Sequence, residues 1–178
     1  MKHLLMTVVI AATLTIGGCA QQQEPTEPQN FLTNDGNVNI LWQSTNDYSD
    51  IEATSGVQSK FEQYLFTELT DGLAKLASKH LAKGQQLDLT VTNVDLAGDV
   101  QPTFGGATND IRVVTDLYPP KISFDYVLTQ NGKVIKSGSE KLNNMGYLMD
   151  IQPIGSDAFP YEQDLLTDWF KNTIVPAL

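Results

Sequence analysis

The sequence has few of the residues on which disulfide, metal and nucleophilic chemistry depend. Cys19 is its one cysteine and there are two histidines, and the C-x-x-C, H-E-x-x-H and G-x-S-x-G motifs are all missing. We therefore expect no intrachain disulfide, no cofactor, no metal site and no recognisable catalytic set. Positive charge is also scarce, because 11 lysines and arginines stand against 21 aspartates and glutamates. The net charge of −10 argues against binding to nucleic acid phosphates or to anionic lipid.

The sequence also lacks an apolar run of the about 20 residues that a transmembrane helix needs. An uncharged stretch, Leu4–Ile16, follows a basic start at Lys2 and precedes two glycines, which is typical of a secretory signal peptide. The end of this stretch, Ile16-Gly17-Gly18-Cys19, resembles the lipobox of bacterial lipoproteins. In a lipobox the cysteine thiol is lipidated, the chain is cleaved before it, and the cysteine becomes the mature N-terminus. An ordinary cleaved signal peptide and an uncleaved anchor are the alternatives.

The residue after the cysteine predicts whether the lipoprotein is held in the inner or in the outer membrane. An aspartate there commonly retains lipoproteins in the inner membrane, whereas this chain has Ala20, so we expect a lipid anchor in the outer membrane and a domain facing the periplasm. Residues 20–36 are rich in glutamine, proline and asparagine, which predicts a disordered tether. The expected organisation is a signal peptide over residues 1–18, lipidated Cys19 with its tether over 19–36, and a single domain over 37–178.

Two helices are predicted from apolar residues that recur every three or four positions. For the first helix, Ser59 and Glu62 have the spacing of a capping box and Gly84 follows as a stop signal. Its apolar stripe consists of Phe61, Leu65, Leu69, Leu73 and Leu76. The second helix is expected to begin near Pro160 and to end at Pro176.

Strands are predicted where apolar and polar residues alternate, over residues 38–42 and 87–91. Asn131-Gly132 predicts a two-residue hairpin turn, because both residues tolerate positive φ angles. The register that follows places Leu128 opposite Ile135, Tyr126 opposite Ser137 and Phe124 opposite Ser139. Together these elements predict an α+β fold, with a mostly antiparallel sheet of four or more strands and two amphipathic helices packed on one face.

The segment from residue 93 to residue 120 is the best candidate for a functional site, because it is long, acidic and contains glycine. It contains Arg112, the one arginine of the chain, and four aspartates: Asp95, Asp99, Asp110 and Asp116. Since a guanidinium group binds carboxylates through a planar fork of donors, we expect Arg112 to be partly buried and bound to one or more of them. The cluster can either pin the segment to the sheet or form an exposed binding site.

Several strings of the sequence together resemble one known family. They are VTNVDLAGDV, NDIRVVTDLYPPKISFDYVL, GKVIKSGSEKL with NNMGY, and YEQDLLTDWF. The family they resemble is DUF3016, a family of small envelope proteins of Gram-negative bacteria, and the resemblance spans residues 38 to 170. It implies an envelope protein and brings no activity or binding residue that could be assigned to positions in this chain.

These observations lead to two functional hypotheses. The first is an outer-membrane lipoprotein whose domain is a non-enzymatic binding or scaffold module for another envelope component, with a protein as its partner. The alternative is a periplasmic hydrolase that cleaves cell-wall glycan with two of the loop aspartates as general acid and nucleophile.

Overall fold

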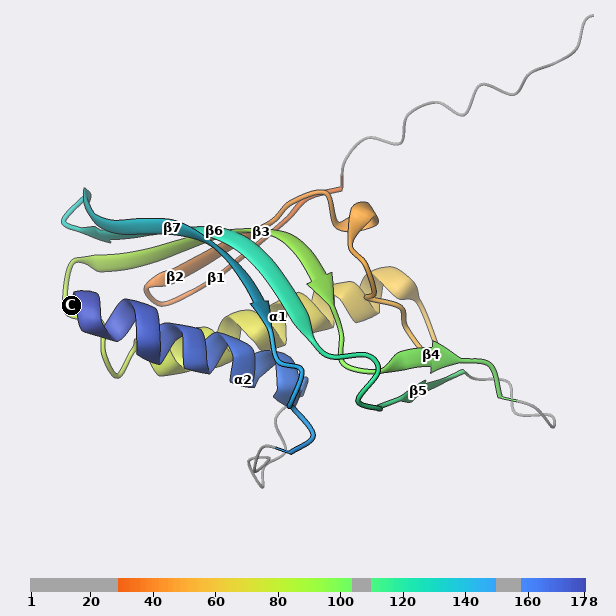
Figure 1. Cartoon of the computed structure of the whole chain (residues 1–178). Coiled ribbons are helices and arrows are strands. Elements are labelled where there is room, and N and C mark those ends of the chain that lie inside the picture. The colour runs from red at the N-terminus through yellow and green to blue at the C-terminus, as the bar shows by residue number, and fades with distance from the viewer. Residues whose placement is uncertain (1–28, 104–109, 150–157) are drawn as a thin grey trace, which may run out of the picture.

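The protein has an α+β fold, described by a computed structural model over residues 29–103, 110–149 and 158–178 (Figure 1). The strands of the main sheet are β1 (Phe31–Asp35), β2 (Val38–Trp42), β3 (Gln85–Asp95), β6 (Lys121–Gln130) and β7 (Lys133–Asn143). They lie in the order β1-β2-β3-β6-β7 and are mostly antiparallel. The two long helices are α1 (Gln58–Ala77) and α2 (Pro160–Trp169). The α+β class and the mostly antiparallel sheet are therefore confirmed, whereas Cys19 and the signal region lie outside the described residues.

β1 corrects the predicted extent of the tether, because this strand lies inside residues 19–36. It pairs antiparallel with β2 and places Phe31 opposite Trp42. The indole Nε1–H of Trp42 donates to Thr33 Oγ1 at 2.8 Å, and Gly36 turns the chain with a φ of 53°. The composition of this segment is mostly polar and therefore does not predict a strand, although a strand needs only alternate residues to face the core.

α1 connects β2 to β3, and these two strands run parallel as such a crossover allows. The predicted capping box is wrong, because no side chain among the described residues caps the first turn and Ser59 lies inside the helix. Glu62 is buried and accepts a hydrogen bond from the side chain of Gln58 at 2.8 Å. The helix ends at Ala77, well before the predicted stop at Gly84.

The turn between β6 and β7 is as predicted, with positive φ angles of 50° at Asn131 and 78° at Gly132. The predicted register holds only for the two pairs next to the turn. From Leu128 onwards a bulge shifts the pairing by one residue, so that Tyr126 faces Gly138 rather than Ser137. A Cβ atom at position 138 would lie 3.0 Å from the Tyr126 ring. The bulge therefore places a glycine where the aromatic ring needs space.

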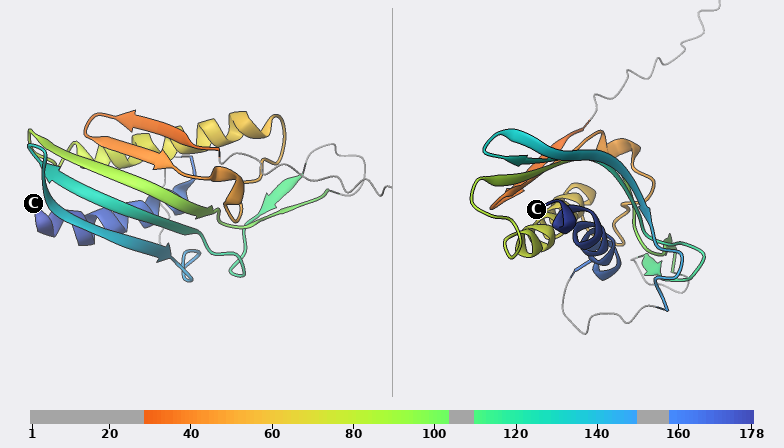
Figure 2. Two further views of the ribbon diagram at one scale, coloured as in Figure 1. Left: turned by 90° about the horizontal axis from the view of Figure 1, so that it is seen from above. Right: turned by 60° about the vertical axis from the view of Figure 1, so that its left-hand side comes forward.

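The core joins both helices to the sheet through aromatic side chains. Phe66 on α1 stacks on Trp42 with ring centroids 4.5 Å apart. Trp169 on α2 packs edge-on against Phe124 at 4.7 Å and against Tyr126 at 5.2 Å. Figure 2 shows α1 and α2 side by side next to the curved sheet, with α1 in contact with β1 and β2 and α2 in contact with β6 and β7. The helical path of α2 continues through a π-helical turn, η2 (Phe170–Ile174), and a short 3-10 turn, η3 (Val175–Ala177).

The segment from 93 to 120 is more regular than expected. After β3 the chain forms a separate antiparallel pair, β4 (Asp99–Gln101) and β5 (Ile111–Val113), at the end of the molecule opposite the C-terminus (Figure 1). The pairing sets Arg112 opposite Val100. Within the described ranges no helix is long and apolar enough to cross a membrane.

Candidate functional site

Arg112 is the centre of a polar cluster that joins β5 to the segment between β2 and α1. Its Nη1 lies 2.7 Å from Oδ2 of Asp50 and its Nη2 lies 3.0 Å from Oδ1, which is a bidentate ion pair. Nη2 also donates to the carbonyl oxygen of Glu52 at 3.0 Å, and Nη1 lies 3.4 Å from the carbonyl oxygen of Gly98. The side chains of Arg112 and Asp50 are 18% and 20% exposed, so the pair is mostly buried.

The partial burial of Arg112 is confirmed, but its predicted partners are wrong. Among the described residues, Arg112 donates no hydrogen bond to any of the four aspartates of its own segment. Asp95 instead pairs with Lys121, whose Nζ lies 2.6 Å from Oδ2. Asp99 begins β4, whereas Asp110 and Asp116 are exposed on either side of β5. The expected cluster is therefore divided, because Arg112 and Asp95 belong to two separate ion pairs, Asp99 lies in β4, and the other two aspartates are exposed.

Asp50 could not be predicted, because its contact with Arg112 depends on a short parallel bridge at the end of β3. The Asp50 N–H donates to the Val94 carbonyl oxygen at 3.3 Å, and the Leu96 N–H donates to the Asp50 carbonyl oxygen at 3.0 Å. This bridge brings together residues more than 40 positions apart. Periodicity and turn signals act over a few residues and carry no information about such a pairing.

Glu162, in the first turn of α2, is a second acidic residue near Arg112. It is only 2% exposed, and its carboxylate accepts the Ala97 N–H at 2.7 Å. Burial raises the pKa of Glu162, while the Ala97 N–H and the positive charge of Arg112 oppose that rise. Glu162 thus ties the turn between β3 and β4 to the start of α2, where a negative charge also complements the helix dipole.

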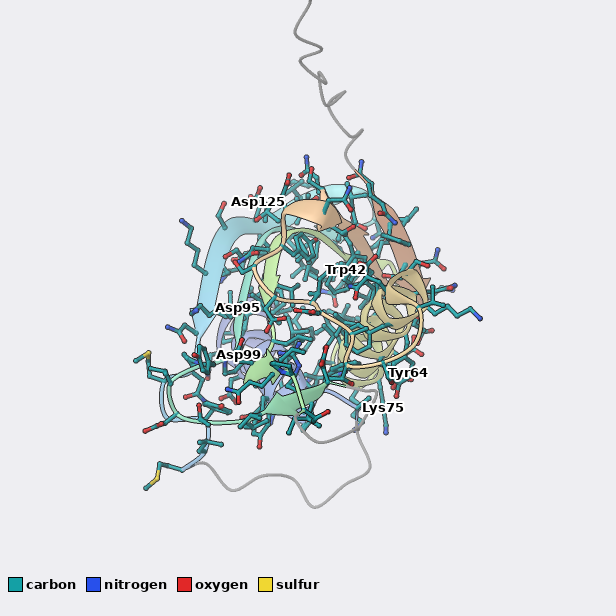
Figure 3. All side chains as sticks on the ribbon, turned by 90° about the vertical axis from the view of Figure 1, so that its right-hand side faces the viewer. Trp42, Tyr64, Lys75, Asp95, Asp99 and Asp125 are labelled. Carbon is teal, nitrogen blue, oxygen red and sulfur yellow. The ribbon has the colours of Figure 1, made fainter. Side chains whose placement is uncertain are left out.

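A polar cavity of about 600 Å³ opens beside this cluster. Five of its lining residues are acidic, namely Asp50, Glu52, Glu62, Asp95 and Asp99, and the described lining includes no lysine or arginine. Figure 3 shows Asp95 and Asp99 near each other on the side of the molecule where β4 lies. The cavity, which we call the acidic cavity, therefore presents negative charge and oxygen acceptors to whatever enters it. In the described chain no group of three or more histidine, cysteine, aspartate or glutamate side chains could hold a metal ion.

The side chain of Gln58 fixes one wall of the acidic cavity. Its Oε1 accepts the Ala53 N–H at 2.9 Å. Its Nε2 donates to the carbonyl oxygen of Ile51 at 2.7 Å and to Glu62 at 2.8 Å. The segment before α1 is thereby bound to the helix, although no regular element contains it.

Arg112 itself lines a smaller cavity of about 300 Å³. Its lining is mainly apolar, with Phe61, Leu96 and Phe159 beside Arg112 and Glu162. Glu52 lines both cavities. Arg112 thus lines the apolar cavity, while its partner Asp50 lines the acidic one.

Gly98 permits the close approach on which the cluster depends. Its φ of 83° is a conformation that other residues rarely adopt, and a Cβ atom there would lie 2.6 Å from the Val113 carbonyl oxygen. The Gly98 N–H also donates to the carbonyl oxygen of Tyr118 at 2.9 Å. A glycine at this position therefore allows the turn before β4 to pack directly on the chain that follows β5.

Comparison with known proteins assigns the family. The sequence model of DUF3016, described as a protein of unknown function, matches residues 36–172, so the chain belongs to this family and the resemblance expected from its sequence is confirmed. No curated protein and no solved structure matches the chain.

Proposed function

We propose that this member of the DUF3016 family is an outer-membrane lipoprotein whose domain is a non-enzymatic binding module for another envelope protein. In this proposal residues 1–18 are the signal peptide and Cys19 carries the acyl chains. A tether shorter than residues 19–36 leads to a domain that begins with β1. The lipobox and Ala20 support the anchor and its membrane, and the net charge of −10 supports a partner other than nucleic acid.

The observation that carries the binding role is the acidic cavity with its fixed walls. Arg112 binds Asp50 and Lys121 binds Asp95, so two carboxylates of the lining are already oriented. A surface that is ordered before binding loses less side-chain entropy when a partner arrives. We further propose that both amphipathic helices cover one face of the sheet, which leaves the end with β4 and β5 available to a partner.

The contacts of Asp50 favour recognition over proton transfer. A general acid needs a proton on a carboxyl oxygen that faces the substrate. Asp50 instead directs both of its oxygens at the guanidinium group of Arg112. This side chain therefore suits an electrostatic role in the cavity wall.

Site-specific photo-crosslinking in intact cells tests the binding role. Asn46 is exposed and lines the acidic cavity, whereas Gln86 is exposed at the start of β3, away from the cavity, and provides the control. We expect a photoreactive amino acid at position 46 to give an adduct of one discrete mass and the same amino acid at position 86 to give none. Recovery of only the uncrosslinked chain from both positions would contradict the proposal.

Acyl labelling tests the anchor separately. The wild-type protein should incorporate a labelled fatty acid and sediment with the outer membrane. Cys19→Ser removes the thiol that the acyl chains need, so the label should be lost and the precursor should stay uncleaved or release a soluble domain. Labelled acyl chains on the serine variant would refute the anchor.

Glycan hydrolysis is the second candidate, because Asp95 and Asp99 line the same cavity. If they act as a catalytic pair, the purified domain should release soluble fragments from peptidoglycan, and Asp95→Asn or Asp99→Asn should each stop the release. Asp88→Asn is the matched control, because Asp88 lies on β3 outside the cavity lining. Fragment release that survives both cavity substitutions would exclude this role for the pair.

A further inference from the structure

More than half of the exposed large apolar side chains in the described chain belong to two neighbouring segments, one in and after β5 and one after β7. Six of these residues form what we call the loop patch: Val114, Leu117, Tyr118, Met145, Leu148 and Met149. Leu117 and Met145 are each 71% exposed and Met149 is 89% exposed. Exposed apolar side chains gathered in this way are typical of an interaction surface, whereas single ones are normal on any protein.

The loop patch rests on a fixed base, because Tyr147 joins its two segments. This side chain is 1% exposed, and its hydroxyl donates to the carbonyl oxygen of Thr115 at 2.7 Å and lies 3.3 Å from that of Tyr118. Its ring packs edge-on against Tyr161 on α2 with centroids 4.8 Å apart. The exposed residues on either side of Tyr147 are therefore presented from an anchored turn.

The loop patch is continuous with the acidic cavity. Tyr118 belongs to the patch and also lines the cavity. Its carbonyl oxygen accepts the N–H of Gly98, the residue before Asp99. An apolar surface and an acidic one therefore meet at Tyr118, and a single ligand can reach both.

The charges around the patch decide between the possible occupants. Segments that lie on membranes usually carry lysine or arginine beside their apolar residues, whereas here exposed Asp116 stands next to Leu117. The nearby cations Arg112 and Lys121 are each bound to an aspartate. Pairing with a second copy about a twofold axis would bring two acidic surfaces together, which is unfavourable. A partner protein with positive charge beside its apolar residues fits both the apolar patch and the negative charge around it.

We propose that the loop patch and the acidic cavity form one docking surface for a partner-protein segment in which apolar side chains stand beside lysine or arginine. This inference rests on the proposed binding function and adds the chemistry of the partner. The apolar side chains cover Leu117, Met145 and Met149, and methionine adapts well to such contacts because its side chain is flexible and polarisable. The cationic group enters the cavity that Asp95 and Asp99 line.

Photo-crosslinking from the patch in intact cells tests the inference. The photoreactive amino acid replaces Leu117 or, separately, Met149. Leu32 and Val134 are matched controls, since they are apolar and 69% and 55% exposed on β1 and β7. We expect the two patch positions to give an adduct with the same partner and the two controls to give none. Mass spectrometry of the linked peptide should find lysine or arginine within a few residues of an apolar attachment site.

Charge reversal tests the acidic half of the surface. Asp99→Lys should lower the adduct yield from position 117 at least about tenfold, because it places like charges together. Asp35→Lys, an equal change in charge on β1, should leave the yield unchanged. Equal yields from both reversals would overturn the inference.

Other outcomes also overturn the inference. They are an adduct made only of two copies of this chain, a partner peptide without basic residues, and binding of the purified protein to phosphatidylethanolamine–phosphatidylglycerol vesicles that Leu117→Ser abolishes. An adduct from position 46 without one from 117 or 149 would refute this inference and leave the proposed function standing. No adduct from any of these positions would refute both.

Discussion

Replacing Arg112 with alanine should destabilise the folded protein by about 2–3 kcal/mol, a value between the costs of losing an exposed and a fully buried ion pair. Loss of one partner costs about 3–5 kcal/mol when a pair is fully buried, and an exposed pair contributes about 0–1 kcal/mol. Arg112 and Asp50 are 18% and 20% exposed, which places this pair nearer the buried limit with a discount for solvent. The alanine variant also leaves Oδ2 of Asp50 and the carbonyl oxygen of Glu52 without their donor, whereas Oδ1 of Asp50 still accepts the Glu52 N–H at 3.1 Å.

Thermal unfolding followed by circular dichroism provides the measurement. For a chain of this size each kcal/mol shifts Tm by roughly 2–4 °C, so Arg112→Ala should lower it by about 5–10 °C. Arg112→Lys should recover less than half of the loss, because an ammonium group has no planar fork to meet both oxygens of Asp50. A double-mutant cycle with Asp50→Ala should give a coupling energy of about 1–3 kcal/mol.

The reasoning fails if Arg112→Ala moves Tm by less than about 2 °C, or if the effects of Arg112→Ala and Asp50→Ala simply add. Lys121→Ala provides a matched control. Its ion pair with Asp95 has exposed fractions of 45% and 22%, so solvent screens it more and the loss should be smaller. Equal losses from the two cations would show that burial does not set the strength of these pairs.

Gly98→Ala should lower the urea midpoint more than Gly56→Ala. The two glycines share a φ near 80° (83° and 81°), but only at position 98 would a Cβ atom lie 2.6 Å from a backbone oxygen, whereas nothing lies within 4 Å at position 56. If the two variants had equal urea midpoints, the close approach of the Val113 carbonyl oxygen could not be the reason why a glycine is needed at position 98. Glu162→Gln should stabilise the protein relative to the wild type by an amount that grows with pH. Burial raises the pKa of Glu162, so its stabilising effect is full below the ordinary carboxyl pKa and is lost as pH rises through the folded value. Denaturation at about pH 4.5 and about pH 7.5 measures the difference, and a difference that does not grow with pH would contradict the raised pKa.

The features that the sequence predicts well are those fixed by neighbouring residues. The alternation of Val38, Ile40 and Trp42 predicts β2, because a strand with one buried face needs that spacing. Asn131-Gly132 predicts its turn, because positive φ angles restrict the residue types that fit. Pro160 likewise marks the start of α2, since proline suits the first helical turn.

The features that the sequence does not predict depend on residues far apart in the chain. β1 is a strand because Phe31 and Thr33 meet β2, although the local composition is that of a linker. The bulge in β7 follows from the fit of the Tyr126 ring against Gly138, and a turn residue cannot encode it. The same holds for the candidate site. The sequence identifies Arg112 as an ion-pair residue, but it predicts aspartates nearby in the sequence as the partners and misses Asp50.

The sequence leaves a structural role and a binding role as alternatives for Arg112, and in the function proposed above these roles belong to different residues of the same cluster. Arg112 does not line the acidic cavity, but it fixes Asp50 and contacts the carbonyl oxygens of Glu52 and Gly98 behind the wall. Its removal loosens the wall and also frees negative charge, so it does not weaken the attraction of a cationic group to the molecules that stay folded. Asp99 lies in the wall itself, and its reversal to lysine changes that attraction directly. In the proposed function, a loss of partner capture on Arg112→Ala therefore reports loss of the ordered wall or of the fold, whereas a loss on Asp99→Lys at unchanged Tm reports recognition of charge.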